Sequence, residues 1–230
     1  MITLYSYPEL FDVADNNPYG LKIFAFLKLS NLEFKHEHVF DAKSAPREQL
    51  PYIIDGDSTV GDSDAIIAHV TAQYGLTMDS GLTDAQRTTH HFIRRTLDDL
   101  YWVMSYSRWR DPQFWPLFRD EMLRRHPALT ESGMDAARNY NFKRYHYQGI
   151  GRYEPGDVYA RGIADLQALA NVTPDHGFLF GAQPSSIDAA AYGFVANILY
   201  YAIDTPLKRF VESHPALVRH TDAVHSRMAQ

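Results

Sequence analysis

Short β-prone runs alternate with turn-forming and helical segments over the first eighty positions. Four runs predict strands, at residues 2–5, 34–40, 49–54 and 58–60. Asn17-Pro18 predicts the start of a helix that ends near Ser30, because asparagine caps a helix well and proline suits its first position. A second helix is predicted from Asp62 to Val70, with carboxylates in its first turn. The resulting order, βαβ followed by ββα, is the thioredoxin-like order of elements.

Strand signals end near Leu82, and apolar positions then recur with helical spacing. Helices are predicted at residues 83–109, 116–125, 135–147, 155–171 and 185–199, with one or two more at 206–229. The change from a mixed to an all-helical pattern predicts a domain boundary near residue 80. We therefore expect an α/β thioredoxin-like N-terminal domain at 1–78 and an all-α C-terminal domain at 82–230.

Composition makes several classes of protein improbable. The 230 residues carry 22 Lys and Arg against 28 Asp and Glu, whereas nucleic-acid-binding proteins usually present a basic face, so we expect no nucleic-acid partner. No apolar run reaches the roughly 20 residues needed to cross a bilayer, and the N-terminus lacks the pattern of a signal peptide. We expect a cytoplasmic protein with no membrane partner. Cysteine is absent, so any thiol chemistry must use the sulfur of another molecule.

Three local patterns fall at characteristic points in this order of elements. Leu50-Pro51 precedes the third predicted strand, and Asp62-Ser63 opens the helix that follows the fourth. Ser185 and Asp188 have the spacing of a capping box at the start of an apolar helix. In these patterns the chain resembles the glutathione S-transferase superfamily. The resemblance implies the glutathione transferase fold, a glutathione-binding N-terminal domain and a purely structural role for the capping box.

Segments of the C-terminal half narrow the resemblance to one branch of that superfamily. Leu100-Tyr101-Trp102, Gln148–Arg152 and His214-Pro215-Ala216-Leu217 resemble the branch that includes failed axon connections proteins and metaxins. The chain departs from this branch where the first helix opens. The motif there reads Asn17-Pro18-Tyr19-Gly20, whereas the branch usually carries serine or cysteine at that point. The departure lies beside the expected sulfur site.

The resemblance also implies how glutathione binds. A cis bond at Leu50-Pro51 turns the preceding backbone groups toward the cysteinyl backbone of glutathione. Gln49 matches a position at which transferases often bring Gln or Lys to the glutathione backbone. Asp62 then pairs with the γ-glutamyl ammonium while Ser63 receives the γ-glutamyl carboxylate. From the residues alone, Asp62 or Ser63 can equally serve only as a helix cap. The glycyl carboxylate needs a donor, for which two cations are candidates that can also be ordinary surface charges: Lys43 and Arg47.

A free thiol has a pKa of about 8.5, so the protein must stabilise the thiolate of bound glutathione. In this fold the sulfur lies at the N-terminus of the first helix, where the dipole and unpaired amides favour an anion. Asn17 occupies the cap position and is our first candidate for a catalytic side-chain donor, with Tyr19 as a further glutathione contact. Asn17 can instead be only a cap, with the donor among other hydroxyls: Tyr5, Ser6, Tyr7 or Tyr19. Of these, Tyr5 lies on the first predicted strand and is expected in the core.

The second substrate is expected between the domains, against the helix predicted at 83–109. Two stripes lie on adjacent faces of this helix: Tyr101, Ser105 and Arg108 on one, and Trp102, Tyr106 and Trp109 on the other. In one interpretation the tryptophan stripe packs in the core and Arg108 pairs with a carboxylate. In the other, Tyr101 and Arg108 face the electrophile as catalytic residues. No histidine spacing indicates a metal site.

These features favour a glutathione transferase, which adds the sulfur of glutathione to a small organic electrophile or displaces a group from it. Glutathione is then a co-substrate, and no metal is expected. The alternative is a non-catalytic binding or scaffold protein with the same fold, as metaxins are. An enzyme that forms a mixed disulfide through its own thiol is excluded, because the chain has no cysteine. The resemblance further implies a homodimer.

Overall fold

The computed structural model describes residues 1–229, and its sheet lies entirely within the first 61 of them. The four strands are β1 (Ile2–Ser6), β2 (Phe34–His38), β3 (Tyr52–Asp55) and β4 (Ser58–Gly61). Their order in the sheet is β2-β1-β3-β4, with β1 parallel to β2 and antiparallel to β3. β3 and β4 are antiparallel neighbours joined by a two-residue turn. This mixed sheet confirms the predicted N-terminal fold.

The helices largely follow the predicted ranges. They are α1 (Pro18–Leu29), α2 (Ser63–Tyr74), α3 (Asp84–Trp109), α4 (Trp115–Arg125), α5 (Glu131–Gln148), α6 (Pro155–Val172), α7 (Ser186–Leu199), α8 (Pro206–Glu212) and α9 (Pro215–Met228). Short 3₁₀ turns lie at Pro46–Glu48 and Ile150–Arg152. The all-α part of the predicted fold is confirmed.

Two boundaries differ from the prediction for a local reason. The third strand begins at Tyr52 rather than at Gln49, because Pro51 has no N–H to donate to the sheet. The helix predicted from 135 begins earlier, at Glu131, because the Thr130 hydroxyl accepts a hydrogen bond from Gly133 and caps it. Turn and cap chemistry, rather than apolar spacing, set both ends.

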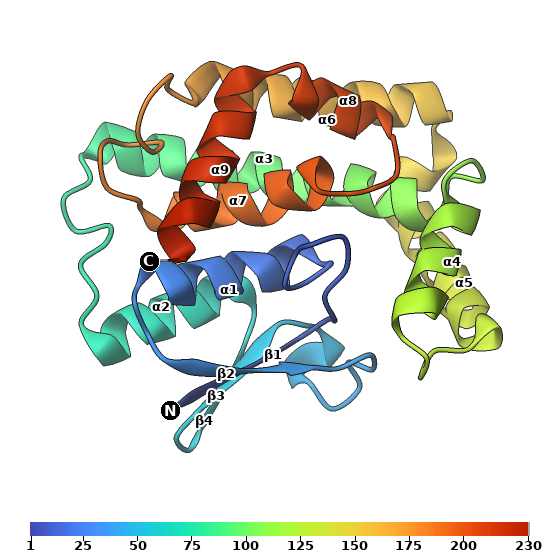
Figure 1. The fold of residues 1–230 in the computed structure, drawn as a ribbon, viewed down its shortest axis with the longest axis horizontal. Coiled ribbons are helices and arrows are strands. Elements are labelled where there is room, and N and C mark those ends of the chain that lie inside the picture. The colour runs from blue at the N-terminus through green and yellow to red at the C-terminus, as the bar shows by residue number, and fades with distance from the viewer. Residues whose placement is uncertain (230) are drawn as a thin grey trace.

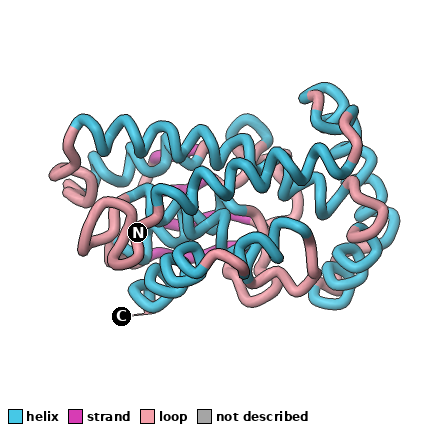
Figure 2. Tube along the Cα trace, turned by 90° about the horizontal axis from the view of Figure 1, so that it is seen from above, coloured by secondary structure: helices cyan, strands magenta, loops and turns pink. Residues whose placement is uncertain are grey.

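The helices form successive layers over one face of the sheet (Figure 1). α1 and α2 lie directly on it, α3, α7 and α9 come next, and α6 and α8 lie farthest away, while α4 and α5 form one end of the molecule. Seen from above, the strands lie beneath this cover of helices (Figure 2). On the other face of the sheet, the rings of Tyr5 and Tyr52 stack at 4.6 Å and remain partly exposed. The expectation that Tyr5 is a core residue is therefore wrong, because its side chain points to the face of the sheet that the helices do not cover.

α7 joins the two halves of the molecule. All residues from Ser186 to Ile198 are buried, and they contact both the core above the sheet and the core of the helical half. Gly193 permits the close approach of α7 to α1, since a Cβ there would lie 2.5 Å from the carbonyl oxygen of Pro18. The N-terminus of α1 is thereby fixed against the helical half of the molecule.

Candidate active site

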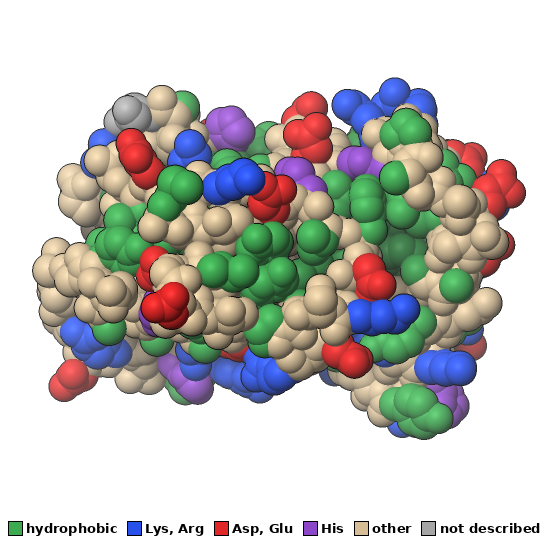
Figure 3. Space-filling view, turned by 90° about the horizontal axis from the view of Figure 1, so that it is seen from below, with side chains coloured by type: hydrophobic (Ala, Val, Ile, Leu, Met, Phe, Trp, Pro, Cys, Tyr) green, Lys and Arg blue, Asp and Glu red, His purple; other side chains and the backbone are tan. Residues whose placement is uncertain are grey.

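A cavity of about 720 Å³ lies between the loop that leads into α1 and the helices α3, α4 and α5. Seen from below, the molecule is hollowed toward the end where α4 and α5 lie, with apolar side chains exposed inside the hollow (Figure 3). Asn17, Tyr101 and Arg108 all line this cavity, as the sequence analysis expected of a shared site. The roles predicted for them stay predictions.

Asn17 lies where α1 begins at the cavity wall. Its Oδ1 accepts a hydrogen bond of 3.0 Å from the backbone N–H of Tyr19, so the predicted cap is confirmed. Pro18 follows at the first helical position. The Nδ2 group of Asn17 has no hydrogen-bond partner within residues 1–229 and lies at the cavity. Asn17 can therefore cap α1 and still donate to a bound anion.

Asp15 lies buried beneath this cap. Its carboxylate accepts from the backbone N–H of Asn17 at 2.6 Å, and its other oxygen is pressed against Gly20, where a Cβ would lie 1.6 Å away. Burial raises the pKa of Asp15 well above its usual value, although hydrogen bonds from Ser6, Asn17 and Tyr7 oppose the rise. A carboxyl that resists ionisation adds less negative charge beside the helix terminus, where an anion is expected.

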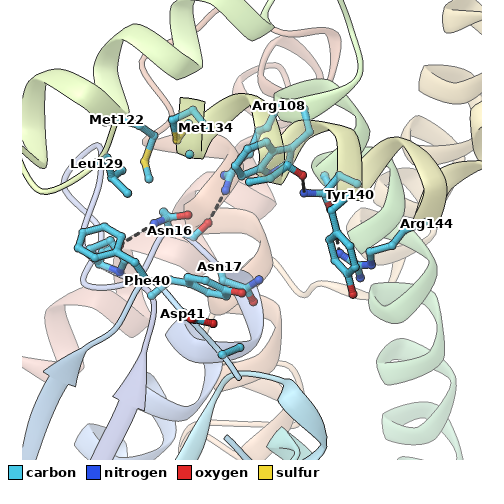
Figure 4. Close-up of a pocket in the computed structure, with 18 of the residues that line it drawn as sticks. Asn16, Asn17, Phe40, Asp41, Arg108, Met122, Leu129, Met134, Tyr140 and Arg144 are labelled. Atoms are coloured by element: carbon cyan, nitrogen blue, oxygen red, sulfur yellow. Dashed lines mark hydrogen bonds between the residues drawn. The ribbon is translucent and has the colours of Figure 1, made fainter. Parts of the chain in front are cut away.

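Arg108 holds the loop that carries Asn17. Its guanidinium donates to the carbonyl oxygen of Asn16 (Figure 4), and to the carbonyl and side-chain oxygens of Asn197 at 2.9 and 3.1 Å. It also lies over the ring of Tyr201 at 4.7 Å. The Asn197 amide in turn donates to the carbonyl of Asp15 at 3.1 Å. Arg108 is thus a buried link between the loop and α7.

These contacts support one part of the first interpretation of α3 and contradict another part. The tryptophan stripe packs against the helical core, as the first interpretation has it. The predicted pairing of Arg108 with a carboxylate is wrong, because backbone and amide oxygens already surround its donors. Sequence spacing could not identify these partners, which lie 89 and 92 positions away along the chain.

Tyr7 and Tyr101 present hydroxyl groups at the cavity. Burial, with smaller contributions from Tyr101 and Asp15, raises the pKa of Tyr7 to about 12, and Arg144 partly opposes this. Tyr7 is therefore protonated at neutral pH, and its hydroxyl has no hydrogen-bond partner among the described residues. From the sequence, Tyr7 was only an alternative thiol donor. In the structure it shares the cavity wall with Tyr101 and Arg144, whose charges influence its pKa.

α5 supplies Tyr140, Asn141 and Arg144 to the cavity wall, and none of the three was predicted from the sequence. The Arg144 guanidinium donates to the side-chain oxygen of Asn141 at 3.0 Å and lies over the rings of Trp102 and Tyr140 at 5.2 and 5.9 Å. The only sequence signal is an arginine amid tyrosines on a helix with little apolar patterning. It shows neither that α5 turns toward α1 nor which face does so.

The predicted glutathione anchor has the expected backbone form. The Leu50–Pro51 bond is cis, as the resemblance implied. Asp62 caps α2 by accepting from the backbone N–H groups of Asp64 and Ala65 at 3.0 and 3.1 Å, and pairs with Arg47 at 3.1 Å. Burial alone would raise the pKa of Asp62, but these bonds hold it below its usual value. Capping by Asp62 is confirmed, and its contact with glutathione stays a prediction.

Ser63 is buried and receives a hydrogen bond of 3.0 Å from Lys22, which also pairs with Asp64 at 2.5 Å. Lys22 brings a buried positive charge to the position where the resemblance places the γ-glutamyl carboxylate. Lys22 was not predicted as a site residue, because a lysine on a helix is ordinarily a surface charge. Its position under the N-terminus of α2 exists only in the folded chain.

Of the remaining predicted contacts, Tyr19, Gln49 and Arg47 are not among the residues that line the cavity. The Tyr19 hydroxyl donates to Asp98 at 3.0 Å, and its ring lies 5.2 Å from that of Tyr101. Gln49 is exposed beside the Leu50–Pro51 bond. Of the two candidate cations, Lys43 lines the cavity, whereas Arg47 is paired with Asp62. The contacts of these residues with glutathione stay predictions.

Comparison with known protein families gives two matches along the chain. Residues 18–114 match the model of the glutathione S-transferase N-terminal domain, and residues 162–224 match that of the glutathione S-transferase C-terminal domain. Neither match includes residues 115–161, which contain α4 and α5. The two matched descriptions agree with each other and with the fold.

Two relatives match nearly the whole chain. An isoprene-epoxide–glutathione S-transferase of Rhodococcus sp. strain AD45 is 28% identical over 99% of both chains. The failed axon connections protein of Drosophila melanogaster is 25% identical over 99% of this chain and 58% of its own length. Among solved structures, the β-etherase of Sphingobium sp. strain SYK-6 superposes with a TM-score of 0.66 over 98% of this chain and 95% of its own, at 17% identity. That likeness concerns the fold.

Proposed function

The chain belongs to the glutathione S-transferase superfamily, and we propose that its cavity joins the sulfur of glutathione to a small electrophile with Asn17 as the thiolate donor. The observation that carries the proposal is the Asn17 side chain, which caps α1 with its oxygen and leaves Nδ2 unpaired at the cavity. The helix terminus and this donor together favour a thiolate. In this proposal residues 1–78 bind glutathione, and residues 82–230 form the site of the electrophile.

Ring opening of an epoxide is the reaction that best suits the donors of the cavity. The thiolate forms a bond to a ring carbon, the carbon–oxygen bond breaks, and the oxygen takes up a proton. Tyr7 is a protonated phenol with a free hydroxyl at the cavity and can donate to that oxygen. The similarity to the isoprene-epoxide transferase supports the same class of substrate. Tyr101 lines the electrophile side, and Arg108 acts by positioning the loop of Asn17.

The alternative of a non-catalytic scaffold draws on the similarity to the failed axon connections protein, but this chain spans only 58% of that protein. A scaffold has no need of an open cavity with unpaired donors beside a helix terminus. None of the helices formed by residues 1–229 is long and apolar enough to span a membrane. We also propose that the reaction takes place in the cytoplasm, and this location is inferred from the sequence alone.

Glutathione binding tests the proposal directly. We expect Asp62→Asn to weaken the affinity for glutathione about tenfold, because the amide keeps an oxygen to cap α2 but loses the charge that pairs with the γ-glutamyl ammonium. Isothermal titration calorimetry of the wild type and the variant measures this change. Asp57→Asn, at the exposed turn between β3 and β4, removes the same charge elsewhere and should leave the affinity unchanged. A wild-type protein that does not bind glutathione would refute the function itself.

A homodimer is also part of the proposal. The large apolar side chains of Phe92 on α3 and Tyr74 on α2 are 64% and 39% exposed, which supports a self-association surface on these helices. We expect light scattering at micromolar concentration to give the mass of two chains, and Phe92→Glu to shift it toward one. A wild-type mass of 26.3 kDa, that of a single chain, would contradict the dimer.

A further inference from the structure

Arg144 is a half-buried cation at the cavity without a charged partner. No carboxylate within residues 1–229 lies at ion-pair distance from its guanidinium. Its neighbours are the Asn141 amide, the Tyr101 hydroxyl and the aromatic rings of Trp102 and Tyr140. By contrast, Arg108, which also lines the cavity, donates its hydrogen bonds to oxygens of Asn16 and Asn197. A partly desolvated guanidinium that retains free donors is a strong binding group for a planar anion.

The cavity has two chemically different ends (Figure 4). Met122, Leu129 and Met134 gather at one end, and Tyr140 and Arg144 lie at the other, with Asn17 between the two. A molecule that reaches Asn17 with its reactive carbon can therefore extend toward either end. A neutral hydrocarbon suits the methionine end, whereas the arginine end suits a negatively charged group.

The wall that carries this difference belongs to the segment between the two family matches. α4 and α5 lie within residues 115–161, which neither the N-terminal nor the C-terminal model covers. The parts of the site expected to bind glutathione, at α1 and at the start of α2, lie within or next to the matched N-terminal range. Arg144 thus lies outside the part of the site that is expected to bind glutathione, and it is available to contact the second substrate.

We propose that the electrophile of this enzyme carries a carboxylate, which Arg144 binds at the tyrosine end of the cavity while the reactive carbon meets the sulfur beside Asn17. The inference rests on the proposed function, since it assumes that glutathione occupies the site. The Tyr101 hydroxyl is bonded to the guanidinium, and the ring of Tyr140 lies 5.9 Å from it, so both phenols lie near the position proposed for the carboxylate. Arg144 is a specificity residue that binds substrate and takes no part in the proton transfers.

Two glutathione conjugates test the proposal without turnover. S-benzylglutathione and S-(4-carboxybenzyl)glutathione differ only in the carboxylate, and calorimetry measures the dissociation constant Kd of each. We expect the wild type to bind the carboxylate conjugate about 10- to 100-fold more tightly than the neutral one, as a charge-assisted pair provides. Arg144→Gln should abolish this preference while keeping the Kd of S-benzylglutathione, and Arg144→Lys should keep part of it. Lys143→Gln, an exposed neighbour on α5, should change neither Kd.

The outcomes separate the inference from the function on which it rests. If the wild type binds glutathione but binds the two conjugates with the same Kd, the transferase proposal stands and the carboxylate inference is overturned. If Arg144→Gln weakens glutathione itself as much as the carboxylate conjugate, the guanidinium serves the tripeptide and the inference is again overturned. If neither glutathione nor either conjugate binds, the proposed function fails, and the inference fails with it.

Discussion

Asp188→Ala is expected to lower the free energy of unfolding by about 3–5 kcal/mol, the range for removing one partner of a buried ionic network. Asp188 is fully buried at the start of α7. Its two oxygens accept from the backbone N–H groups of Leu179 and Ser185, from the Ser185 hydroxyl and from His220, each at 2.7 Å. Alanine would leave these donors buried without acceptors at the helix that joins the two halves.

Urea unfolding followed by circular dichroism measures this change. Thr83→Ala removes the cap of the exposed capping box on α3 and should cost only about 1 kcal/mol, which makes it a matched control. Asp188→Asn keeps one acceptor oxygen and should fall between the two. A cost for Asp188→Ala no larger than that for Thr83→Ala would show that the buried network contributes little.

The contribution of Asp188 also has a defined dependence on pH. Burial alone would raise the pKa of Asp188, but the bonds from His220, Leu179 and Ser185 outweigh burial and hold the pKa below its usual value. A depressed pKa in the folded state gives stability that is fully present above the unfolded pKa of about 3.9. It is lost as the pH falls through the lower, folded value. The difference in the free energy of unfolding between the wild type and Asp188→Asn should therefore become smaller only below about pH 4.

Asn17→Asp is expected to lower the turnover number about 100- to 1,000-fold, at the upper end of the range for losing a preorganised donor. Aspartate keeps the oxygen that caps α1 but replaces Nδ2 with a second oxygen that carries negative charge. The thiolate would then face a like charge instead of a donor, so the pKa of the bound thiol should rise. Ultraviolet titration of the bound thiolate measures that pKa, and the acid limb of the activity profile should move to higher pH with it.

Two further variants separate the effects of the cap, the donor and the added charge at position 17. Asn17→Ala, which loses both cap and donor but adds no charge, should lower turnover about 10- to 100-fold. Asn17→Ser keeps a cap and a donor and should stay within about tenfold of the wild type. If Asn17→Asp titrates like the wild type, another group holds the sulfur. Ser6 is fully buried and bonded to His36, and Tyr19 is bonded to Asp98, which leaves Tyr7 as the donor to examine next.

The sequence by itself determined the features that local chemistry controls. The cap at Asn17, the capping box at Ser185 and Asp188, and the start of the helix that follows Thr83 each depend on side chains within four residues of one another. Apolar spacing likewise determined the order of strands and helices. The resemblance, carried by short motifs such as Leu50-Pro51 and Asp62-Ser63, located the expected glutathione side of the site because those motifs lie on contiguous backbone.

Only the tertiary structure decided the far side of the site. The partners of Arg108 lie 89 and 92 positions away, so its spacing on α3 could not distinguish a substrate contact from the link to α7 that it makes. In the sequence, Lys22 and Arg144 look like ordinary surface cations of helices. Packing buries Lys22 beside Ser63 and places Arg144 at the cavity. A charge becomes part of a site when other elements exclude water from it at a position that a ligand can reach, and that depends on how distant segments meet.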